Sequence, residues 1–532
     1  MEDSRPTKRR LWIPCFLLFA YGALYGWTVQ SETMLGPYLV LFGGILFTLL
    51  TWLWFTFLSG IRPLLRWTSF TIGIGLIAFL YASLRFDGSS SGTGLPRFVW
   101  KWAPTVREQS QQTLANAPST PQTADAESDE STLKYRAVDS SQYLGPNGNG
   151  VFPDLNVDVG ALGDSLEAIW RQPIGLGWAG FATKGRLAIT QEQRGEEEWV
   201  SAYDIESGAL RWKYAKQRRF SESMGGDGPR ATPTIVDETV YALGATGILD
   251  ALNVTDGTPI WSYNALAQGG SNLTWGKSAS PLHLAEEELI VVTGGGQGGP
   301  TVQAVNTQYG ESAWTWGTEP ASYATPIVAT IHDERQLVIV NENTVVGLRP
   351  SSGELLWSFD WPVGMMPSTP KVGQPTVIDG SKILITASYG IGSILLEIKK
   401  EDDETLSTSV IWHAKNRMKT KFSSACVLGE HAYGLDEGRL ACIELESGKR
   451  LWKDGKYGYG QNILVGNTLI VQAEDGDVAF VEATPEKFNE WARVPGITGK
   501  TWNVPTLAGE YLLIRNDQEA ACYRVPTVSS TP

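Results

Sequence analysis

Cysteine and histidine are scarce, with four of each among 532 residues. The cysteines (Cys15, Cys426, Cys442 and Cys522) are scattered, and no two of them are adjacent or spaced as CxxC. This pattern excludes a disulfide framework. The four histidines show no spacing typical of a zinc site, so no metal site is predicted.

An excess of basic charge is also lacking. The net charge is −14 and the sequence pI is about 5.0, which excludes an extended nucleic-acid-binding surface. The sequence shows no nucleophile elbow of the GxSxG type and no HExxH, P-loop or EF-hand motif. A GxGxxG match at Gly294–Gly299 is followed by Pro300 and a strand-like segment, where a dinucleotide site would need a helix.

Glycine and tryptophan are abundant, and they recur together in one phrase. In each of its five copies the Gly stands four residues before the Trp. A Gly at this place supplies the positive φ of a tight turn, and the Trp anchors the following strand. The copies are DIESGALRW (204–212), NVTDGTPIW (253–261), NTQYGESAW (306–314), RPSSGELLW (349–357) and ELESGKRLW (444–452).

Eight tryptophans about 40 to 55 residues apart mark the full array, a spacing that suits one four-stranded propeller blade per repeat. The count is open by one blade because three of them lack the turn Gly. Leu166–Pro173 has a Trp strand without inner strands, and Gly509–Val525 has inner strands without a Trp strand, so the two are predicted to complete one blade. The anchors are Trp170, Trp212, Trp261, Trp314, Trp357, Trp412, Trp452 and Trp491.

The repeats, with Val240–Leu243 (VYAL), Asp256-Gly257 and Ile260-Trp261, resemble those of the quinoprotein (PQQ-type) eight-bladed propeller family. That family includes PQQ-dependent dehydrogenases and the propeller of the outer-membrane protein-assembly lipoprotein. The resemblance covers residues 135–526 and implies an all-β propeller. It is specific for fold and weak for function, since the repeat motif builds blades and does not touch a cofactor.

The first 85 residues contain three apolar runs, Leu11–Val29, Pro37–Leu58 and Trp67–Leu84, each near the ~20 residues that span a bilayer. A cleaved signal peptide explains the first run alone, so a three-helix transmembrane anchor is preferred. Basic residues precede the first run and separate the second from the third, which places the N-terminus in the cytoplasm of a bacterial cell and the propeller in the periplasm. The predicted domains are a cytoplasmic basic tail (1–10), three transmembrane helices in the inner membrane (11–85), a flexible linker (86–134), the propeller (135–526) and a C-terminal tail (527–532).

In such a propeller the loops that lead from each Trp strand to the next blade open on one face, the channel mouth. The sequence therefore places its candidate ligand- or cofactor-binding residues there, with Met365 and Met366 in the same set of loops. Polar loops and aromatics that merely pack around the axis are the alternative explanation. The candidates are Trp178, Glu192, Arg194, Asp227, Arg230, Asn272, Trp275, Lys277, Tyr323, Asn416, Lys421, Tyr459, Gln461, Trp502 and Asn503.

Three functions fit these residues. The preferred one is a non-enzymatic binding or scaffold module for a protein segment or small ligand in the cell envelope, without a cofactor. The second, implied by the resemblance, is a PQQ-dependent sugar or alcohol dehydrogenase, although the adjacent cysteines of many alcohol-oxidising members are missing. The third is a polysaccharide-binding propeller with Trp178, Trp275 and Trp502 as its platform. The PQQ alternative needs an aromatic floor, a cation and oxygen ligands for Ca²⁺, nominally Trp275 or Trp502, Arg230 or Lys277, and Glu192, Asn272 or Asp227.

Overall fold

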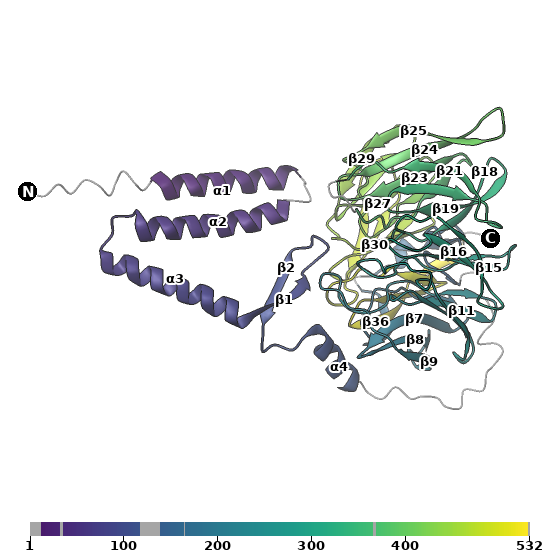
Figure 1. Cartoon of the computed structure of the whole chain (residues 1–532), viewed down its shortest axis with the longest axis horizontal. Helices are drawn as coiled ribbons and strands as arrows, with labels where there is room; N and C mark the ends of the chain where they lie inside the picture. The colour runs from purple at the N-terminus through teal and green to yellow at the C-terminus, as the bar shows by residue number, and fades with distance from the viewer. Residues whose placement is uncertain (1–11, 32–35, 117–138, 164, 365–368, 530–532) are drawn as a thin grey trace, which may run out of the picture. The chain divides into compact units, whose positions relative to one another are not determined.

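A computed structural model of the chain describes residues 12–31, 36–116, 139–163, 165–364 and 369–529 (Figure 1). The chain divides into two compact units, Met1–Thr105 and Val106–Pro532. The predicted basic tail, and the predicted start of the propeller at residue 135, lie outside the described residues. The two units are described separately.

The N-terminal unit contains three long helices, α1 (Trp12–Ser31), α2 (Gly36–Phe57) and α3 (Pro63–Ser83). Among the described residues, α2 and α3 are long and apolar enough to cross a membrane. The prediction of three spanning helices therefore holds only in part: three helices form, and two of them meet the requirement.

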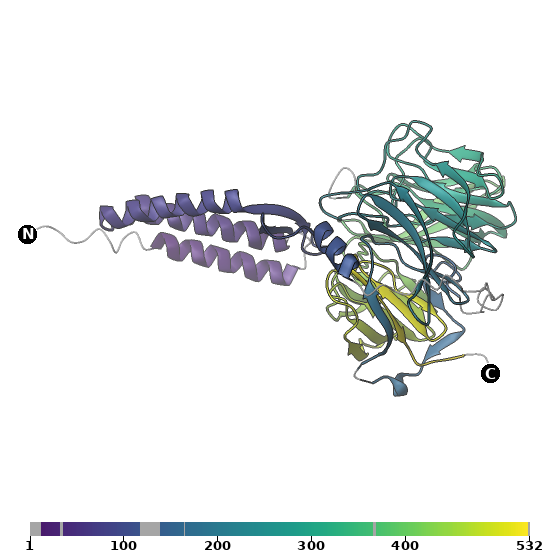
Figure 2. The same cartoon turned by 90° about the horizontal axis from the view of Figure 1, so that it is seen from below.

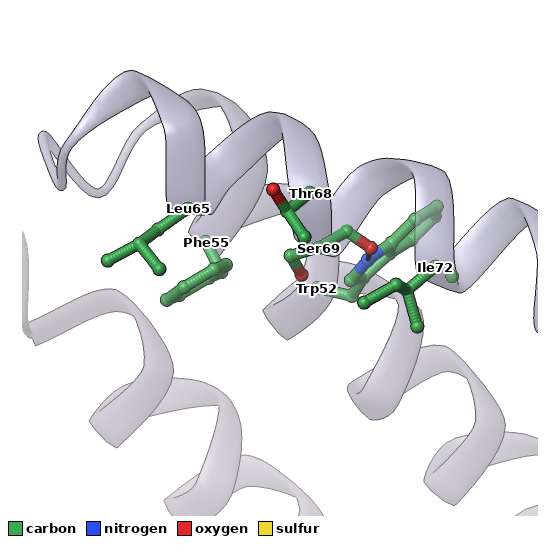
Figure 3. A pocket seen from close by; sticks show the side chains of 7 residues that line it. Trp52, Phe55, Leu65, Thr68, Ser69 and Ile72 are labelled. Carbon is green, nitrogen blue, oxygen red and sulfur yellow. Dashed lines mark hydrogen bonds between the residues drawn. The ribbon is translucent and has the colours of Figure 1, made fainter.

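An open hollow of about 460 Å³ lies between α2 and α3 (Figure 3). The Trp52 indole crosses it, donating a hydrogen bond to the Ser69 carbonyl at 3.3 Å and stacking on Phe70 with ring centroids 5.6 Å apart. None of the lining residues is ionisable, so the hollow offers no group for acid–base chemistry. They are Trp52, Phe55, Leu65, Thr68, Ser69, Ile72 and Gly73.

Regular structure follows α3 in a stretch whose composition predicts a flexible linker. Strands β1 (Leu84–Ser89) and β2 (Pro96–Trp100) form an antiparallel hairpin. The facing rings of Phe86 and Phe98 and the ion pair of Arg97 with Asp87 hold it. These cross-strand pairs cannot be recognised from average composition. Residues 117–134 of the predicted linker lie outside the described residues.

The second unit begins with helix α4 (Val106–Asn116) and then forms eight blades, confirming the predicted count. Each blade is an antiparallel sheet whose strands follow one another from the inside outwards, except at the closing blade. Blade 1 is β6 (Ala182–Lys184), β7 (Leu187–Arg194), β8 (Glu197–Asp204) and β9 (Leu210–Gln217); blade 2 is β10 (Thr234–Val236), β11 (Thr239–Leu243), β12 (Ile248–Asn253) and β13 (Pro259–Asn264). Blade 3 is β14 (Leu282–Leu284), β15 (Leu289–Thr293), β16 (Val302–Asn306) and β17 (Ser312–Trp316); blade 4 is β18 (Ile327–Ile331), β19 (Glu334–Val340), β20 (Thr344–Leu348) and β21 (Leu355–Asp360). Blade 5 is β22 (Thr376–Ile378), β23 (Lys382–Ala387), β24 (Gly392–Lys400) and β25 (Leu406–Ala414); blade 6 is β26 (Cys426–Leu428), β27 (His431–Asp436), β28 (Arg439–Glu444) and β29 (Arg450–Asp454). Blade 7 is β30 (Gln461–Val465), β31 (Thr468–Gln472), β32 (Val478–Glu482) and β33 (Glu490–Val494).

Blade 8 joins the two ends of the propeller, as the sequence predicts. Its inner strands are β34 (Thr506–Ala508), β35 (Tyr511–Arg515) and β36 (Glu519–Arg524), and its outer strand is β5 (Glu167–Pro173). The register pairs Cys522 with Trp170. The blue and yellow strands consequently lie side by side in both views (Figures 1 and 2). Closure of this kind removes two strand edges that would otherwise be unpaired.

The anchor tryptophans connect neighbouring blades. Trp212 on β9 donates its indole N–H to the Val254 carbonyl in the β12–β13 turn of blade 2 at 2.8 Å. Its ring covers Gly257, which has a φ of +72° and no side chain to obstruct the contact. The repeated Gly therefore both makes the turn and receives the Trp of the preceding blade. Equivalent indole-to-carbonyl hydrogen bonds of 2.8–3.0 Å are made by Trp170, Trp261, Trp314, Trp412 and Trp452.

Two predicted anchors behave differently. Trp357 donates to the Gln336 side chain at 2.7 Å and packs on Gly347 of its own blade. The β24–β25 hairpin of blade 5, on which it would dock, is long and lacks the turn Gly. Trp491 lies on β33 and faces a blade whose third and fourth strands come from opposite ends of the chain. No covalent turn joins those strands, so the usual receptor for the indole does not exist there.

A segment before blade 1 lies along the channel axis, which the sequence did not predict. Ser140 bonds to Thr183 of blade 1 and Leu507 of blade 8, and Gly150 accepts a hydrogen bond from Leu464 of blade 7. Each of these partners lies on an innermost strand, near the end that leads into the β-turn to the second strand. β3 (Val151–Phe152) then pairs in parallel with β30. The segment occupies the end of the channel away from the crossover loops.

The chain end is also structured. β4 (Leu155–Val157) pairs with β37 (Thr527–Ser529), and the short helix η2 (Val159–Ala161) follows β4. Leu155 and Val157 pack into the core shared by blades 7 and 8. Residues 527–529, predicted as part of a tail, thus form a strand that covers the closing seam.

Replacing a docking glycine should destabilise the propeller beyond the cost of its φ. In Gly257→Ala the new Cβ overlaps the Trp212 ring, so we expect a loss of about 2–4 kcal/mol, from left-handed backbone strain plus overpacking. Gly429→Ala is a matched control, because Gly429 also has a positive φ, +56°, but nothing lies within 4 Å of its Cβ position. Urea denaturation followed by tryptophan fluorescence measures both. Equal losses in the two variants would refute the docking role.

Candidate functional site

The strand order fixes which loops share a face. Because every blade is antiparallel from inside to outside, the crossover loops between blades and the loops between second and third strands lie together. The glycine turns that receive the tryptophans lie at the opposite ends of the strands. The face with the crossover loops is called the mouth below, and helix α4 contacts it through an ion pair of Arg107 with Glu196 in the β7–β8 loop.

Aromatic rings from four successive crossover loops meet at the mouth. Trp178 and Trp502 have ring centroids 4.8 Å apart, and Trp502 lies 4.9 Å from Phe422, which in turn lies 6.2 Å from Tyr459. These loops enter blades 1, 8, 6 and 7 respectively. Phe422 and Trp502 belong to loops that are not neighbours, so their contact requires the loops to converge toward the axis. We call these four residues the aromatic run.

Two lysines and two glutamates surround the aromatic run. The Lys500 ammonium is 4.3 Å from the Trp502 centroid, and the buried Lys421 ammonium is 4.8 Å from the Tyr459 centroid. Glu474 accepts the Trp502 indole N–H at 2.8 Å, and Glu437 accepts the Tyr459 hydroxyl at 2.9 Å. Burial lowers the pKa of Lys421, while Glu437 and Glu474 oppose that shift. The mouth therefore combines ring faces with balanced opposite charges.

A second group of rings continues around the mouth. Trp275 and Tyr323 have ring centroids 5.7 Å apart, and the Arg230 guanidinium is 4.6 Å from the Phe220 centroid. Trp178 links the two groups by donating its indole N–H to a carbonyl in the Arg230 loop, that of Gly225, at 2.6 Å.

Two ionisable groups are buried near the backbone of Ala245. The Lys277 ammonium donates to the Thr293 carbonyl at 3.1 Å, and burial lowers its pKa to about 7. Burial raises the pKa of Glu198 to about 7, against a hydrogen bond from the Ala245 N–H. Lys277 in turn donates its backbone N–H to the Ala245 carbonyl. Both side chains are inside the protein and not on the mouth surface.

Glu192 and Arg194 lie where blade 1 packs against blade 8. Arg515 of blade 8 is fully buried and donates to the Gln191 and Gly175 carbonyls of the blade 1 side. Burial would raise the pKa of Glu192, but nearby Arg194, Ser201, Arg515 and Tyr203 outweigh it and hold the pKa at about 2. The Glu192 oxygens are engaged by the Gly175 N–H, the Ser201 and Tyr203 hydroxyls and the Arg194 guanidinium.

The remaining predicted residues have local partners. Asp227 pairs with Arg219, and Asn416 lies in an exposed turn after β25. Three amides bridge backbone groups: Asn272 donates to Ala245, Gln461 to Phe422 and Trp502, and Asn503 to Gly177 and Ala179. Met365 and Met366 lie outside the described residues. Of the predicted set, the structure brings Trp178, Lys421, Tyr459, Gln461 and Trp502 together at one side of the mouth and Arg230, Trp275 and Tyr323 at the other.

Sequence reasoning missed six of the mouth residues. Phe220, Phe422 and Lys500 lie in crossover loops from which other residues were selected, and proximity in the same loop was the available signal. Glu437, Glu474 and Tyr389, whose ring centroid is 4.9 Å from the Lys421 ammonium, lie in loops between second and third strands, which the prediction searched only in blade 1. Applying the same rule to every blade would have found them.

The oxygen donors nominated for a PQQ-bound Ca²⁺ do not fit that role. Glu192 is fully buried with its oxygens engaged, Asp227 is paired with Arg219 and Ser221, and the Asn272 oxygen accepts the Leu273 N–H. Within the described residues, no group of three or more His, Cys, Asp or Glu side chains could hold a metal ion. The donors the cofactor would require are thus committed to protein partners.

The fold and the repeat define an eight-bladed PQQ-type propeller. A family model described as outer membrane protein assembly factor BamB matches residues 158–274 and 271–454. The chain therefore belongs to the family of outer membrane protein assembly factor BamB.

The chain is also similar to individual proteins and solved structures. Outer membrane protein assembly factor BamB of Salmonella typhimurium is 33% identical over 101 residues, which span 18% of this chain and 24% of the relative. The crystal structure of BamB from Moraxella catarrhalis is 15% identical, with a TM-score of 0.50, over 68% of this chain and 99% of that one. Quinohemoprotein alcohol dehydrogenase ADHIIG from Pseudomonas putida HK5 is 12% identical, with a TM-score of 0.41, over 75% of this chain and 79% of that one.

The buried Glu192 carboxylate should make stability fall in acid. Its folded-state pKa of about 2 lies below the usual ~4.3, so its stabilisation is complete above that usual value and is lost as the pH falls toward 2. We expect the free energy of unfolding of the wild type to drop by roughly 3 kcal/mol more than that of Glu192→Gln over this range. Urea titrations at pH 7, 5, 4, 3 and 2 measure it. Glu446→Gln, at an exposed position, should lose as much stability in acid as the wild type. An equal loss in Glu192→Gln would contradict the low pKa assigned to Glu192.

Proposed function

We propose that the protein is a membrane-anchored binding module of the cell envelope, whose extracytoplasmic propeller holds a protein segment at the mouth. The observation that carries this proposal is the aromatic run, in which loops from four blades present partly exposed rings beside paired charges. Aromatic residues with a few polar groups are typical of peptide- and ligand-binding surfaces. Membership of a family named for outer membrane protein assembly supports a protein as the partner.

The N-terminal helices support the anchor. We propose that α1, α2 and α3 all cross the inner membrane; among the described residues, α2 and α3 are long and apolar enough to do so. Arg62 lies between α2 and α3, and Arg66, in the first turn of α3, donates to the Thr56 and Phe57 carbonyls at the end of α2. Basic residues at this loop favour its cytoplasmic location, which would place the propeller in the periplasm.

The engaged oxygen donors weigh against the dehydrogenase alternative. Glu192 is paired with Arg194, and this contact would have to break before it could bind Ca²⁺. Breaking a buried ion pair costs about 3–5 kcal/mol. A non-enzymatic function requires no such rearrangement.

Crosslinking in intact cells tests the binding module. A photoreactive benzoyl-phenylalanine at Ser223, an exposed mouth residue in the Arg230 loop, should trap an envelope protein. The same group at Glu446, which is exposed in a glycine turn at the other ends of the strands, should not. Adding Trp502→Ala should lower the Ser223 adduct about tenfold, because central aromatic anchors dominate interface energetics.

Equal adducts from Ser223 and Glu446 would exclude the mouth as the binding surface. Thermal melting of the Trp502→Ala protein should show that it is still folded. If it is folded and the adduct persists undiminished, the aromatic run is not the contact surface.

A cofactor titration tests the alternative directly. Purified protein mixed with PQQ and Ca²⁺ should show no dye-linked oxidation of glucose or ethanol above a protein-free control, because the required oxygen donors are engaged. Activity that saturates with PQQ would establish the dehydrogenase and overturn the binding-module proposal.

A further inference from the structure

The aromatic run already holds an ammonium group that belongs to the chain itself. The Lys500 Nζ lies 4.3 Å from the Trp502 centroid and 5.2 Å from the Trp178 centroid. The two indoles are tilted by 40° with centroids 4.8 Å apart. A cation shared between two indole faces is a favourable cation–π arrangement.

The opposite end of the run repeats this arrangement. The Lys421 Nζ is 4.9 Å from the Tyr389 centroid, 4.8 Å from that of Tyr459 and 5.6 Å from that of Phe422. Lys421 is only 5% exposed. Lys500 is partly exposed and follows Gly499, which has a φ of +101°. Of the two ammonium groups, Lys500 is the one that can leave its rings without opening the core.

Carboxylates support the rings from behind. Glu474 accepts both the Trp502 indole N–H at 2.8 Å and the Tyr459 backbone N–H at 3.2 Å. Glu437 accepts the hydroxyls of Tyr459 at 2.9 Å and Ser388 at 2.5 Å. A carboxylate bound to an indole N–H or phenol O–H increases the negative potential of the ring face.

Charge balance indicates what can replace Lys500. The positive charges of Lys421 and Lys500 equal in number the negative charges of Glu437 and Glu474. These four residues together are therefore neutral when Lys500 is in place. When Lys500 moves out, one negative charge is left beside the faces of Trp178 and Trp502. An incoming cation restores the balance, whereas an anion or a neutral sugar does not.

We propose that the faces of Trp178 and Trp502 form a subsite for a cationic side chain, lysine or arginine, of a bound protein segment, and that Lys500 occupies it until the segment displaces it. This inference rests on the proposed function, whose partner it specifies as a basic segment. Lys500 is thus an internal competitor that sets the affinity of the mouth.

Small cations test the subsite without knowledge of the partner. The probes are tetramethylammonium and capped lysine (N-acetyl-lysine methylamide), with capped norleucine as the neutral match, titrated into the full-length protein by calorimetry. Lys500→Ala should bind both cations about two- to thirtyfold more tightly than the wild type, the range given by one cation–π interaction. Lys449→Ala, an exposed lysine of a glycine turn, should match the wild type.

Several results would overturn the proposal. Capped norleucine binding Lys500→Ala as tightly as capped lysine would show an apolar subsite. Unchanged or weaker cation binding in Lys500→Ala would show that Lys500 does not compete. Adding Trp502→Leu to Lys500→Ala should abolish the gain, with the Trp178–Trp502 pair lost; retention of the gain in a folded double variant would place the site elsewhere.

The tests of the two proposals can fail independently. An adduct trapped at Ser223 without cation binding would leave the binding module standing and remove the cationic subsite. Cation binding without any trapped protein would retain the subsite and remove the protein partner. Loss of both would remove both.

Discussion

The contact on which this propeller depends is the indole of one blade lying on the glycine turn of the next. It combines three requirements in one place: a positive φ, a missing Cβ and a free backbone carbonyl. Each docked Trp fixes the angle between two sheets that share no backbone hydrogen bonds. The direction is always from one blade to its successor, so the contacts form a series that runs around the ring. Where blade 5 lacks the glycine turn, Trp357 turns back into its own blade and the series is interrupted.

The same architecture separates stability from function by face. The glycine turns that receive the tryptophans lie at one set of strand ends. The crossover loops at the opposite strand ends take no part in these contacts between blades. Those loops carry the aromatic run, Lys421, Lys500 and the supporting glutamates. The axial segment that begins at Ser140 fills the channel end below the glycine-turn side of the inner strands. The channel is therefore open to a ligand at the mouth and is filled by the axial segment at its other end.

How far the sequence could predict this structure depends on the range of the contacts. The blade count and the joining of Leu166–Pro173 to the last blade were predictable, because both follow from a local phrase and its spacing. The inward turn of Trp357 was not, since it depends on a hairpin in the next blade. The axial segment was missed because its Gly- and Asn-rich stretch before Val151 has the composition of an ordinary loop. Glu192 was assigned to the mouth, although its carboxylate is buried and is held by the Gly175 N–H, Arg194, Ser201 and Tyr203. The loops that form the candidate site were predictable. The contacts between their side chains were not, because the residues in contact come from different blades.

Ring closure also has a consequence in time. β5 pairs with β36, and the contact of Arg171 with Glu519 joins residues 348 positions apart. At a synthesis rate of about 5–20 residues per second, β5 waits roughly 20 to 70 s for its partner strand to be made. During that interval its edge is unpaired and open to other strands, and Trp178 has no Trp502 to meet. A nascent chain therefore has no complete mouth until Trp502 has been made.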